Sequence, residues 1–302
     1  MNMKHLVILC FLFCSVLAAC KEDALTDADA DIPGLGRDTW PEGPLDVWIK
    51  DSLTKNYNVA VKYKWDQGEL DFGKNLVPPD ESKIIPVLST IRSVWIDNYV
   101  AEAGVNFMKR YIPKYFVMVG SPSFNTDGTI TLGTAEGGRR IVLYVLNYFR
   151  VKGMPGYMPS DSFNVKEMFH TIQHEFGHIL HQNILYTPDF KRISVGMYTS
   201  NWNNVSDAQA NSDGFITAYA MSAADEDFVE MISMMLVEGR GGFNAMLAGI
   251  TQNGPAGTTP DQARAKLRAK EAIVVSYFKT VWNIDFYSLQ ARTRASVEAL
   301  IK

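Results

Sequence analysis

Four of the five histidines in this 302-residue chain fall within twelve residues. They are His170, His174, His178 and His181, and the middle pair encloses Glu175 in an H-E-x-x-H pattern. In an α-helix, positions four residues apart lie on the same face, one turn above the other. Two imidazoles placed in this way can bind one zinc ion, and Glu175 can then reach a water molecule on that metal. The spacing therefore predicts a zinc site with a general base beside it.

A catalytic zinc ion usually keeps three protein ligands, so the chain must supply one more. Metzincins place a third histidine six residues after the second, but position 184 is isoleucine, which excludes that class. His181 lies one turn beyond His178, where it would not readily close around the same ion. We therefore interpret His181 as a pocket-lining or core residue rather than as a ligand. His170, one turn before the motif, is predicted to support the site or to have a structural role.

Better candidates for the third ligand lie in an acidic segment that begins another amphipathic helix. Glu226 and Glu230 are four residues apart and so share one helical face. In the glutamate-zincin arrangement, a glutamate from a helix packed against the histidine helix completes the metal site, which predicts Glu226 as the ligand. Glu230 would then accept the N–H of a ligating histidine. The alternatives are that the acidic turn only complements the helix dipole, with Asp225 as the N-cap, or that Asp227 is the ligand.

Residues 165–240 resemble the catalytic region of anthrax lethal factor-type gluzincins. The resemblance rests on the H-E-x-x-H motif, on Tyr219 seven residues before Glu226, and on Glu230 four residues after it. It implies that the two motif histidines and Glu226 bind one zinc ion. Glu175 would activate the zinc-bound water and pass its proton to the leaving amine, and Tyr219 would hydrogen-bond the oxyanion. The alternative for Tyr219 is a place in the core.

The first twenty residues are typical of a targeting segment rather than of a folded element. A short apolar run follows Lys4 and ends Leu-Ala-Ala-Cys at Cys20, which resembles the lipobox of bacterial lipoproteins. That resemblance implies cleavage of residues 1–19 and lipidation of Cys20, and the alternative is a plain secretory signal. The three cysteines all lie in this segment, so the sequence predicts no disulfide and no thiolate metal site. Residues 20–40 are predicted to be an acidic, flexible tether.

The sequence around Cys20 also bears on location and partners. Cys20-Lys21-Glu22-Asp23 resembles the surface-export signal of Bacteroidota lipoproteins. With the zinc motif, the chain resembles the substrate import-associated zinc metallohydrolase lipoproteins of Bacteroidota. That family implies a lipid anchor in the outer membrane, surface-exposed or on the periplasmic face, a peptide or protein substrate, and a TonB-dependent transporter with its lipoprotein partner. Nucleic acid is not expected, because the net charge is −4 and no basic patch is evident.

The order of the predicted elements favours an α+β fold, because most strands precede most helices. We expect a single zincin-like metallopeptidase domain over residues 41–302, with a small mixed sheet over the H-E-x-x-H helix and a helical C-terminal part. The expected strands cover 59–65, 115–119, 129–132 and 140–145. The expected helices cover 45–57, 84–110, 164–182, 225–238, 243–250, 260–281 and 286–301, with an irregular active-site surface at 186–212.

Three functions are compatible with these patterns. The first is a lipid-anchored zinc peptidase, with one Zn²⁺ per chain and a role in nutrient import. The second is a non-catalytic zincin-fold lipoprotein that presents substrate to a transporter, against which the intact Glu175 argues. The third is a helical protein without a metal, in which the histidine pattern arose by chance.

Overall fold

The structure, a computed structural model, describes residues 41–302 except 66, 71–72, 126–129, 132 and 137–139. The predicted signal at 1–19, the tether at 20–40 and Cys20 therefore lie outside the described residues. Residues 43–302 form one compact unit. Within the described part of the chain, no helix combines the length and the apolar character needed to cross a membrane.

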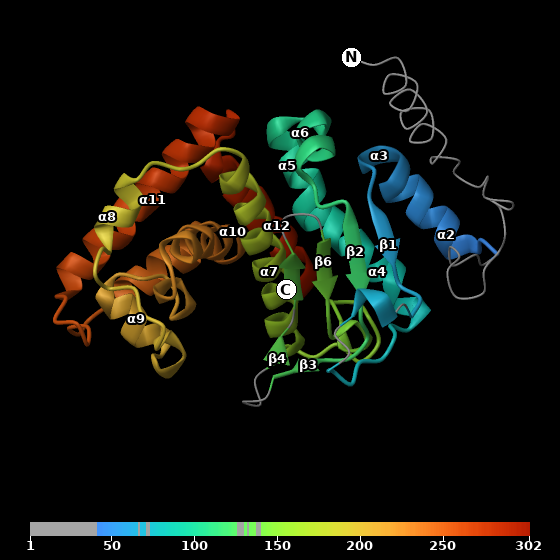
Figure 1. The fold of residues 1–302 in the computed structure, drawn as a ribbon, viewed down its shortest axis with the longest axis horizontal. Coiled ribbons are helices and arrows are strands. Elements are labelled where there is room, and N and C mark those ends of the chain that lie inside the picture. Colours follow the sequence, from blue (N-terminus) through green and yellow to red (C-terminus); the bar gives the residue numbers. More distant parts are fainter. Residues whose placement is uncertain (1–40, 66, 71–72, 126–129, 132, 137–139) are drawn as a thin grey trace, which may run out of the picture. The chain divides into compact units, whose positions relative to one another are not determined.

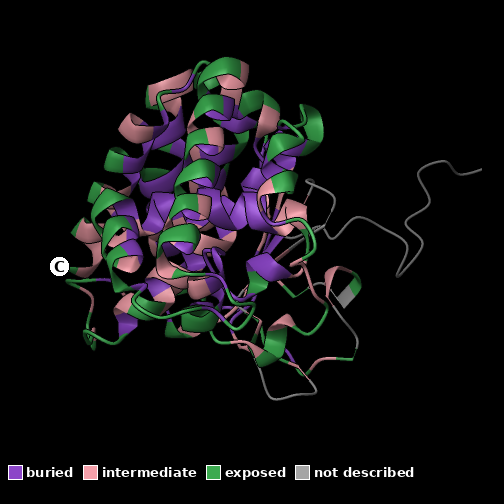
Figure 2. Ribbon diagram, turned by 90° about the vertical axis from the view of Figure 1, so that its left-hand side faces the viewer, coloured by how far each residue is buried: buried purple, intermediate pink, exposed green. Residues whose placement is uncertain are grey.

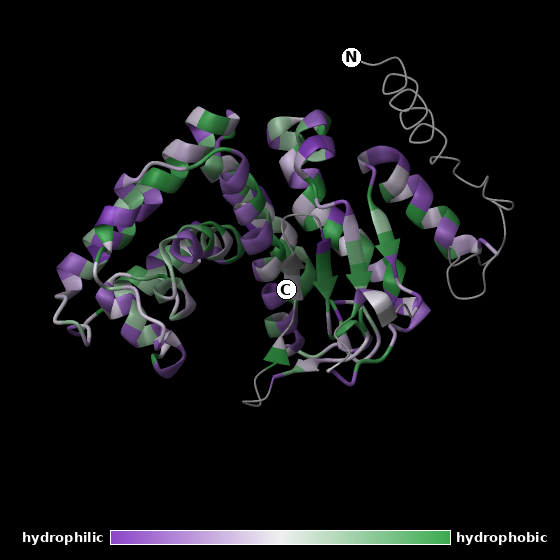
Figure 3. Ribbon diagram, in the orientation of Figure 1, coloured by the Kyte–Doolittle hydropathy of each residue, from purple (hydrophilic) through white to green (hydrophobic). Residues whose placement is uncertain are grey.

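A small mixed sheet forms in the first half of the compact unit (Figure 1). Among the described residues its strand order is β1-β2-β6-β5, where β1, β2 and β6 are parallel and β5 runs antiparallel on the edge. The last three residues of each central strand, β2 and β6, are apolar and buried, which suits strands covered on both faces (Figure 3). The strands are β1 Ala60–Lys62, β2 Tyr115–Met118, β6 Arg140–Leu143 and β5 Gly133–Glu136, and a separate antiparallel pair consists of β3 Ser123–Phe124 and β4 Ile130–Thr131.

Two of these strands correct the sequence prediction. A glycine-rich turn was expected between the strands at 129–132 and 140–145, but β5 lies in that segment and pairs with β6. Its composition is a poor guide because pairing with a neighbouring strand outweighs weak intrinsic β-propensity. The strand β3 was not predicted either, since it is only two residues long.

Several short helices precede the strands or lie between them in the chain. The predicted helix at 84–110 is not continuous, because Gly104 adopts a left-handed φ of 82° and separates α5 from α6. Glycine has no Cβ and reaches this conformation without steric strain. The elements are α2 Pro44–Ile49, η1 Lys50–Thr54, α3 Lys55–Tyr57, η2 Gln67–Glu69, α4 Glu81–Ile91, η3 Arg92–Ile96, α5 Asp97–Ala103, α6 Val105–Tyr111 and η4 Leu146–Tyr148.

The histidine helix α7 (Asp161–Asn183) lies between the sheet and the helices that follow it. It contacts β5 and β6 on one side and packs extensively against α10 (Ala224–Gly249) on another. Its apolar side is anchored by Phe176, whose ring meets the rings of Trp95 and Tyr99 edge-on at 5.2 and 4.9 Å. Figure 2 shows buried residues concentrated on the sides of the helices that face the interior. These ring contacts therefore fix the apolar side of α7, the helix that carries the H-E-x-x-H motif.

The remaining helices complete the C-terminal half. The segment 186–212, predicted to be irregular, contains two short helices, α8 Asp189–Ile193 and α9, which begins at Asp207. The helix predicted to end at Gly239 continues after a non-helical kink at that residue, where φ is 68° and ψ is 178°. The other elements are η5 Trp202–Asn204, α9 Asp207–Asp213, η6 Tyr219–Met221, α11 Pro260–Trp282 and α12 Phe286–Ile301.

Candidate metal centre

Three side chains from two helices converge on one point. The Nε2 atoms of His174 and His178 on α7 each lie 3.2 Å from Oε2 of Glu226 on α10. A tetrahedral zinc ion about 2.0–2.2 Å from its ligands holds the ligand atoms roughly 3.3 Å apart. The observed spacing fits that geometry, so the residues present can hold a zinc ion.

The close packing of α7 on α10 brings the third group within reach. A Cβ atom at Gly177 would lie 3.0 Å from Cγ1 of Val229 on α10. Glycine at this position therefore allows the two helices to approach, at a cost of about 1 kcal/mol in helix propensity. Glu226 lies in the first turn of α10, where that approach directs it at the two histidines.

Glu230, one turn further along α10, lies on the opposite side of the His174 ring. Its Oε1 atom is 2.7 Å from both Nδ1 of His174 and Nε2 of His170. Its second oxygen accepts a hydrogen bond of 2.6 Å from the Thr217 hydroxyl. A carboxylate at Nδ1 places the proton of a neutral imidazole there and leaves Nε2 free to bind a metal.

His170, His174 and Glu230 form a second group that could be considered as a metal site. Its spacings of 2.7 Å are hydrogen-bond lengths and fall short of the roughly 3.3 Å expected around zinc. The side chain of Glu230 is 3% exposed, whereas that of Glu226 is 22% exposed. Catalysis needs an open position for water and substrate, so the group with Glu226 is the better metal centre.

The charges in the cluster favour a cation between the two carboxylates. Burial lowers the pKa of His174, but its hydrogen bonds to Glu226 and Glu230 outweigh this effect and raise it to about 10. Burial raises the pKa of Glu226, but hydrogen bonds to His174 and His178 reverse the shift and hold it well below the usual range. The metal-free cluster therefore keeps both glutamates ionised and a proton on His174.

Two further side chains could act on a substrate at this centre. Glu175 lies on α7 between the two histidines and is partly buried. The ring of Tyr219 in η6 is centred 5.8 Å from the His174 ring and 4.9 Å from the Trp202 ring. Tyr219 is 38% exposed, so the alternative of a core tyrosine does not hold. Burial and the charge of Glu226 raise the pKa of Tyr219, which keeps its hydroxyl protonated and able to donate.

His181 lies behind the centre rather than in it. Its Nε2 atom is 3.0 Å from Nδ1 of His178, on the side of that ring away from Glu226. The His181 side chain is buried, and its Nδ1 atom has no hydrogen-bond partner among the described residues. The Nδ1 atom of His178 thus faces the buried ring of His181, whereas the Nδ1 atom of His174 faces the carboxylate of Glu230.

The other acidic residues at the start of α10 have different partners. The N-cap is Ala223, not Asp225, which instead accepts a hydrogen bond from Tyr186 and pairs with Lys191 at 3.0 Å. Asp227 pairs with Lys270 at 2.7 Å, and both side chains are fully buried. The alternative of Asp227 as the metal ligand is therefore wrong.

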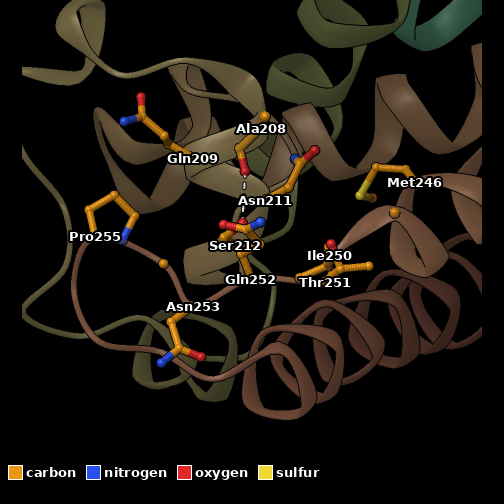
Figure 4. A pocket seen from close by; sticks show the side chains of 12 residues that line it. Ala208, Gln209, Asn211, Ser212, Met246, Ile250, Thr251, Gln252, Asn253 and Pro255 are labelled. Atoms are coloured by element: carbon orange, nitrogen blue, oxygen red, sulfur yellow. Dashed lines mark hydrogen bonds between the residues drawn. The ribbon is translucent and has the colours of Figure 1, made fainter.

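The sequence does not reveal the roles of Thr217, which contacts Glu230, and Trp202, which contacts Tyr219. Nothing in their spacing distinguishes them, because both lie in connecting segments whose path depends on the tertiary structure. The sequence also does not reveal a pocket of about 620 Å³ between α9, the end of α10 and the segment after α10 (Figure 4). That pocket is lined by amide, hydroxyl and apolar groups, without a titratable side chain. We assign the chemistry to the histidine cluster, which has the bases and the ligand atoms.

Comparisons with known proteins point in the same direction. The sequence profile of a family described as "Putative zinc-binding metallo-peptidase" matches residues 38–287. A crystal structure of a protein with the same description, from Bacteroides caccae, superimposes with a TM-score of 0.68 at 29% sequence identity. The match covers 85% of this chain and 93% of the other. No curated protein matches the chain.

Proposed function

Since this chain belongs to that zinc-binding metallopeptidase family, we propose that it is a gluzincin-type peptidase with one zinc ion held by His174, His178 and Glu226. The observation that carries the proposal is the convergence of these three ligand atoms beside Glu175 and Tyr219. A bound zinc ion would supply a Lewis acid and lower the pKa of a water molecule towards about 7.

Three side chains of this protein then have separate roles in peptide hydrolysis. Glu175 accepts a proton from the attacking water and delivers it to the nitrogen of the leaving amine. Tyr219 donates a hydrogen bond to the carbonyl oxygen as negative charge develops there, a role typically worth about 3 kcal/mol. Glu230 holds the ring of His174 through Nδ1 and is itself held by Thr217.

We also propose where this activity is used. The lipobox ending at Cys20 and the acidic tether after it support a lipid-anchored protein of the outer membrane, exposed at the cell surface or in the periplasm. Peptide or protein fragments released there would suit uptake by a TonB-dependent transporter and its lipoprotein partner. The resemblance of residues 17–23 to export and lipidation signals is what supports this part of the proposal.

A fluorogenic peptide library, assayed with and without a zinc chelator, tests the proposed activity. The wild-type protein is expected to cleave peptides, and the chelator is expected to abolish cleavage until zinc is restored. Glu175→Gln is expected to keep zinc and lose activity, whereas Glu81→Gln, an exposed substitution on α4, is expected to leave both unchanged. A zinc-loaded protein that binds peptides without cleaving them would instead be a binding lipoprotein.

A further inference from the structure

The ring of His178 is held from both sides. Its Nε2 atom faces Oε2 of Glu226 at 3.2 Å, and its Nδ1 atom faces Nε2 of His181 at 3.0 Å. His181 follows three residues later on the same helix, so the contact is between adjacent turns of α7. The two candidate histidine ligands therefore have different neighbours at Nδ1, an imidazole for His178 and the carboxylate of Glu230 for His174.

The chemistry of imidazole fixes the direction of this contact when a metal is bound. A ring nitrogen that binds a metal offers its lone pair, so a neutral ring carries its proton on the other nitrogen. Glu226 lies at Nε2 of His178, which makes Nε2 the metal-facing atom and Nδ1 the protonated one. The Nδ1–H group then needs an acceptor, and Nε2 of His181 lies at hydrogen-bond distance.

We propose that His181 is a positioning residue that accepts the Nδ1–H hydrogen bond of His178 and so fixes the tautomer and orientation of that ligand. The inference rests on the proposed metal centre but not on peptide hydrolysis. It requires that the proton of His181 sits on Nδ1, because its Nε2 atom is the acceptor.

The surroundings of His181 support this role. Its ring is 3% exposed and lies against the aromatic rings of Tyr186 and Phe228, at centroid distances of 5.7 and 6.2 Å. Its Nδ1 atom, which would carry the proton, has no hydrogen-bond partner among the described residues. A buried polar atom without a partner destabilises a fold, and an apolar side chain would suit this aromatic surrounding better. The histidine is therefore explained by what its other nitrogen does.

A neutral acceptor also suits the charge of the centre. Glu175, Glu226 and Glu230 already place three carboxylates around the two ligand histidines. A fourth carboxylate behind His178 would add like charge in a buried position. An imidazole that accepts through Nε2 adds no negative charge at that position.

Three substitutions at position 181 test whether His181 acts as a hydrogen-bond acceptor or only fills the space beside His178. Glutamine at position 181 places its amide oxygen near the position of Nε2, whereas asparagine reaches only as far as Nδ1, and methionine fills the volume without an acceptor. We expect His181→Gln to bind zinc within about threefold of the wild type, and His181→Asn and His181→Met to bind about 10–100-fold more weakly. The zinc dissociation constant is measured by competition with a chromogenic chelator, and melting of the metal-free proteins shows that each variant folds. Equal affinities for His181→Gln and His181→Asn would overturn the proposal.

NMR spectroscopy of the wild-type protein tests the same proposal without any substitution. The ¹⁵N chemical shifts of the imidazole nitrogens in the zinc-loaded protein report which nitrogen carries each proton. We expect protonated Nδ1 atoms in both His178 and His181, and a proton on Nε2 of His181 would contradict the inference. If the protein binds zinc in this way but cleaves no peptide, the proposed function fails and the role of His181 stands. If it cleaves peptides but the shifts place the proton on Nε2 of His181, only this inference fails.

Discussion

Oε1 of Glu230 lies 2.7 Å from Nδ1 of His174, the nitrogen opposite the one that faces the candidate metal position. The same oxygen is 2.7 Å from Nε2 of His170, and the Thr217 hydroxyl holds the other oxygen. Glu230 is therefore fixed by three partners and in turn fixes the ring of His174. The geometry of the candidate metal centre thus depends on Glu230, a buried carboxylate outside the group of three residues proposed to hold zinc.

Replacing Glu230 with glutamine should weaken zinc binding by about 10–100-fold, because the neutral amide no longer polarises the His174 ring. Glu238→Gln on the same helix is the matched control, since Glu238 pairs with Lys166 and Arg294. Competition with a chelator measures both affinities. Equal affinities for the two variants would show that Glu230 does not act through His174.

Zinc binding should release a proton. In the metal-free protein the pKa of His174 is about 10, so the ring is protonated at pH 7.5 and must lose that proton before it can bind a metal. A raised pKa means that the proton competes with the metal below that pH. Zinc affinity should accordingly rise by about tenfold per pH unit until the pH approaches 10. Calorimetry at pH 7.5 in two buffers of different ionisation enthalpy measures how many protons are released when zinc binds. If none is released, the pKa of His174 is not raised.

Tyr219→Phe should lower kcat by about 100-fold, because the lost hydroxyl stabilises the charge that develops during the reaction. The control is Tyr148→Phe, since Tyr148 is an exposed tyrosine in η4. Steady-state kinetics on one cleaved peptide gives kcat and KM for both. A kcat within twofold of the wild type for Tyr219→Phe would remove Tyr219 from the mechanism.

Gly177→Ala should destabilise the fold although alanine is the better helix former. The added Cβ would lie 3.0 Å from Val229, and overpacking of this kind costs about 1–3 kcal/mol against a gain of about 1 kcal/mol in propensity. Gly241→Ala, whose Cβ would have no neighbour within 4 Å, should instead stabilise α10. Urea unfolding measures the stability of both variants. Gly177→Ala should cost less stability in a Val229→Ala background, where the methyl group that the added Cβ meets is absent. If Gly177→Ala were more stable than the wild type, the close approach of α7 and α10 at this position would not require glycine.

The sequence predicts the parts of the site that follow from helical periodicity. His174 and His178 share a face because they are four residues apart, and the same rule links Glu226 with Glu230. The resemblance to gluzincins then predicts that the two helices bind one zinc ion together and that Tyr219 lies beside it. The coarse α+β class also follows, because apolar strand patterns precede the long amphipathic helices.

What the sequence could not give depends on contacts between distant segments. The partner of Asp227 is Lys270, which lies on another helix, and nothing near either residue indicates the pair. Thr217 reaches Glu230 only through the path of the loop before η6. The pairing of β5 with β6 likewise overrides a glycine-rich composition that favours a turn.

Anomalous diffraction at the zinc edge, from crystals grown with zinc, tests the metal centre most directly. We expect one peak about 2.0–2.2 Å from Nε2 of His174, Nε2 of His178 and an oxygen of Glu226. A peak between His170, Nδ1 of His174 and Glu230, or no peak near either group, would contradict it.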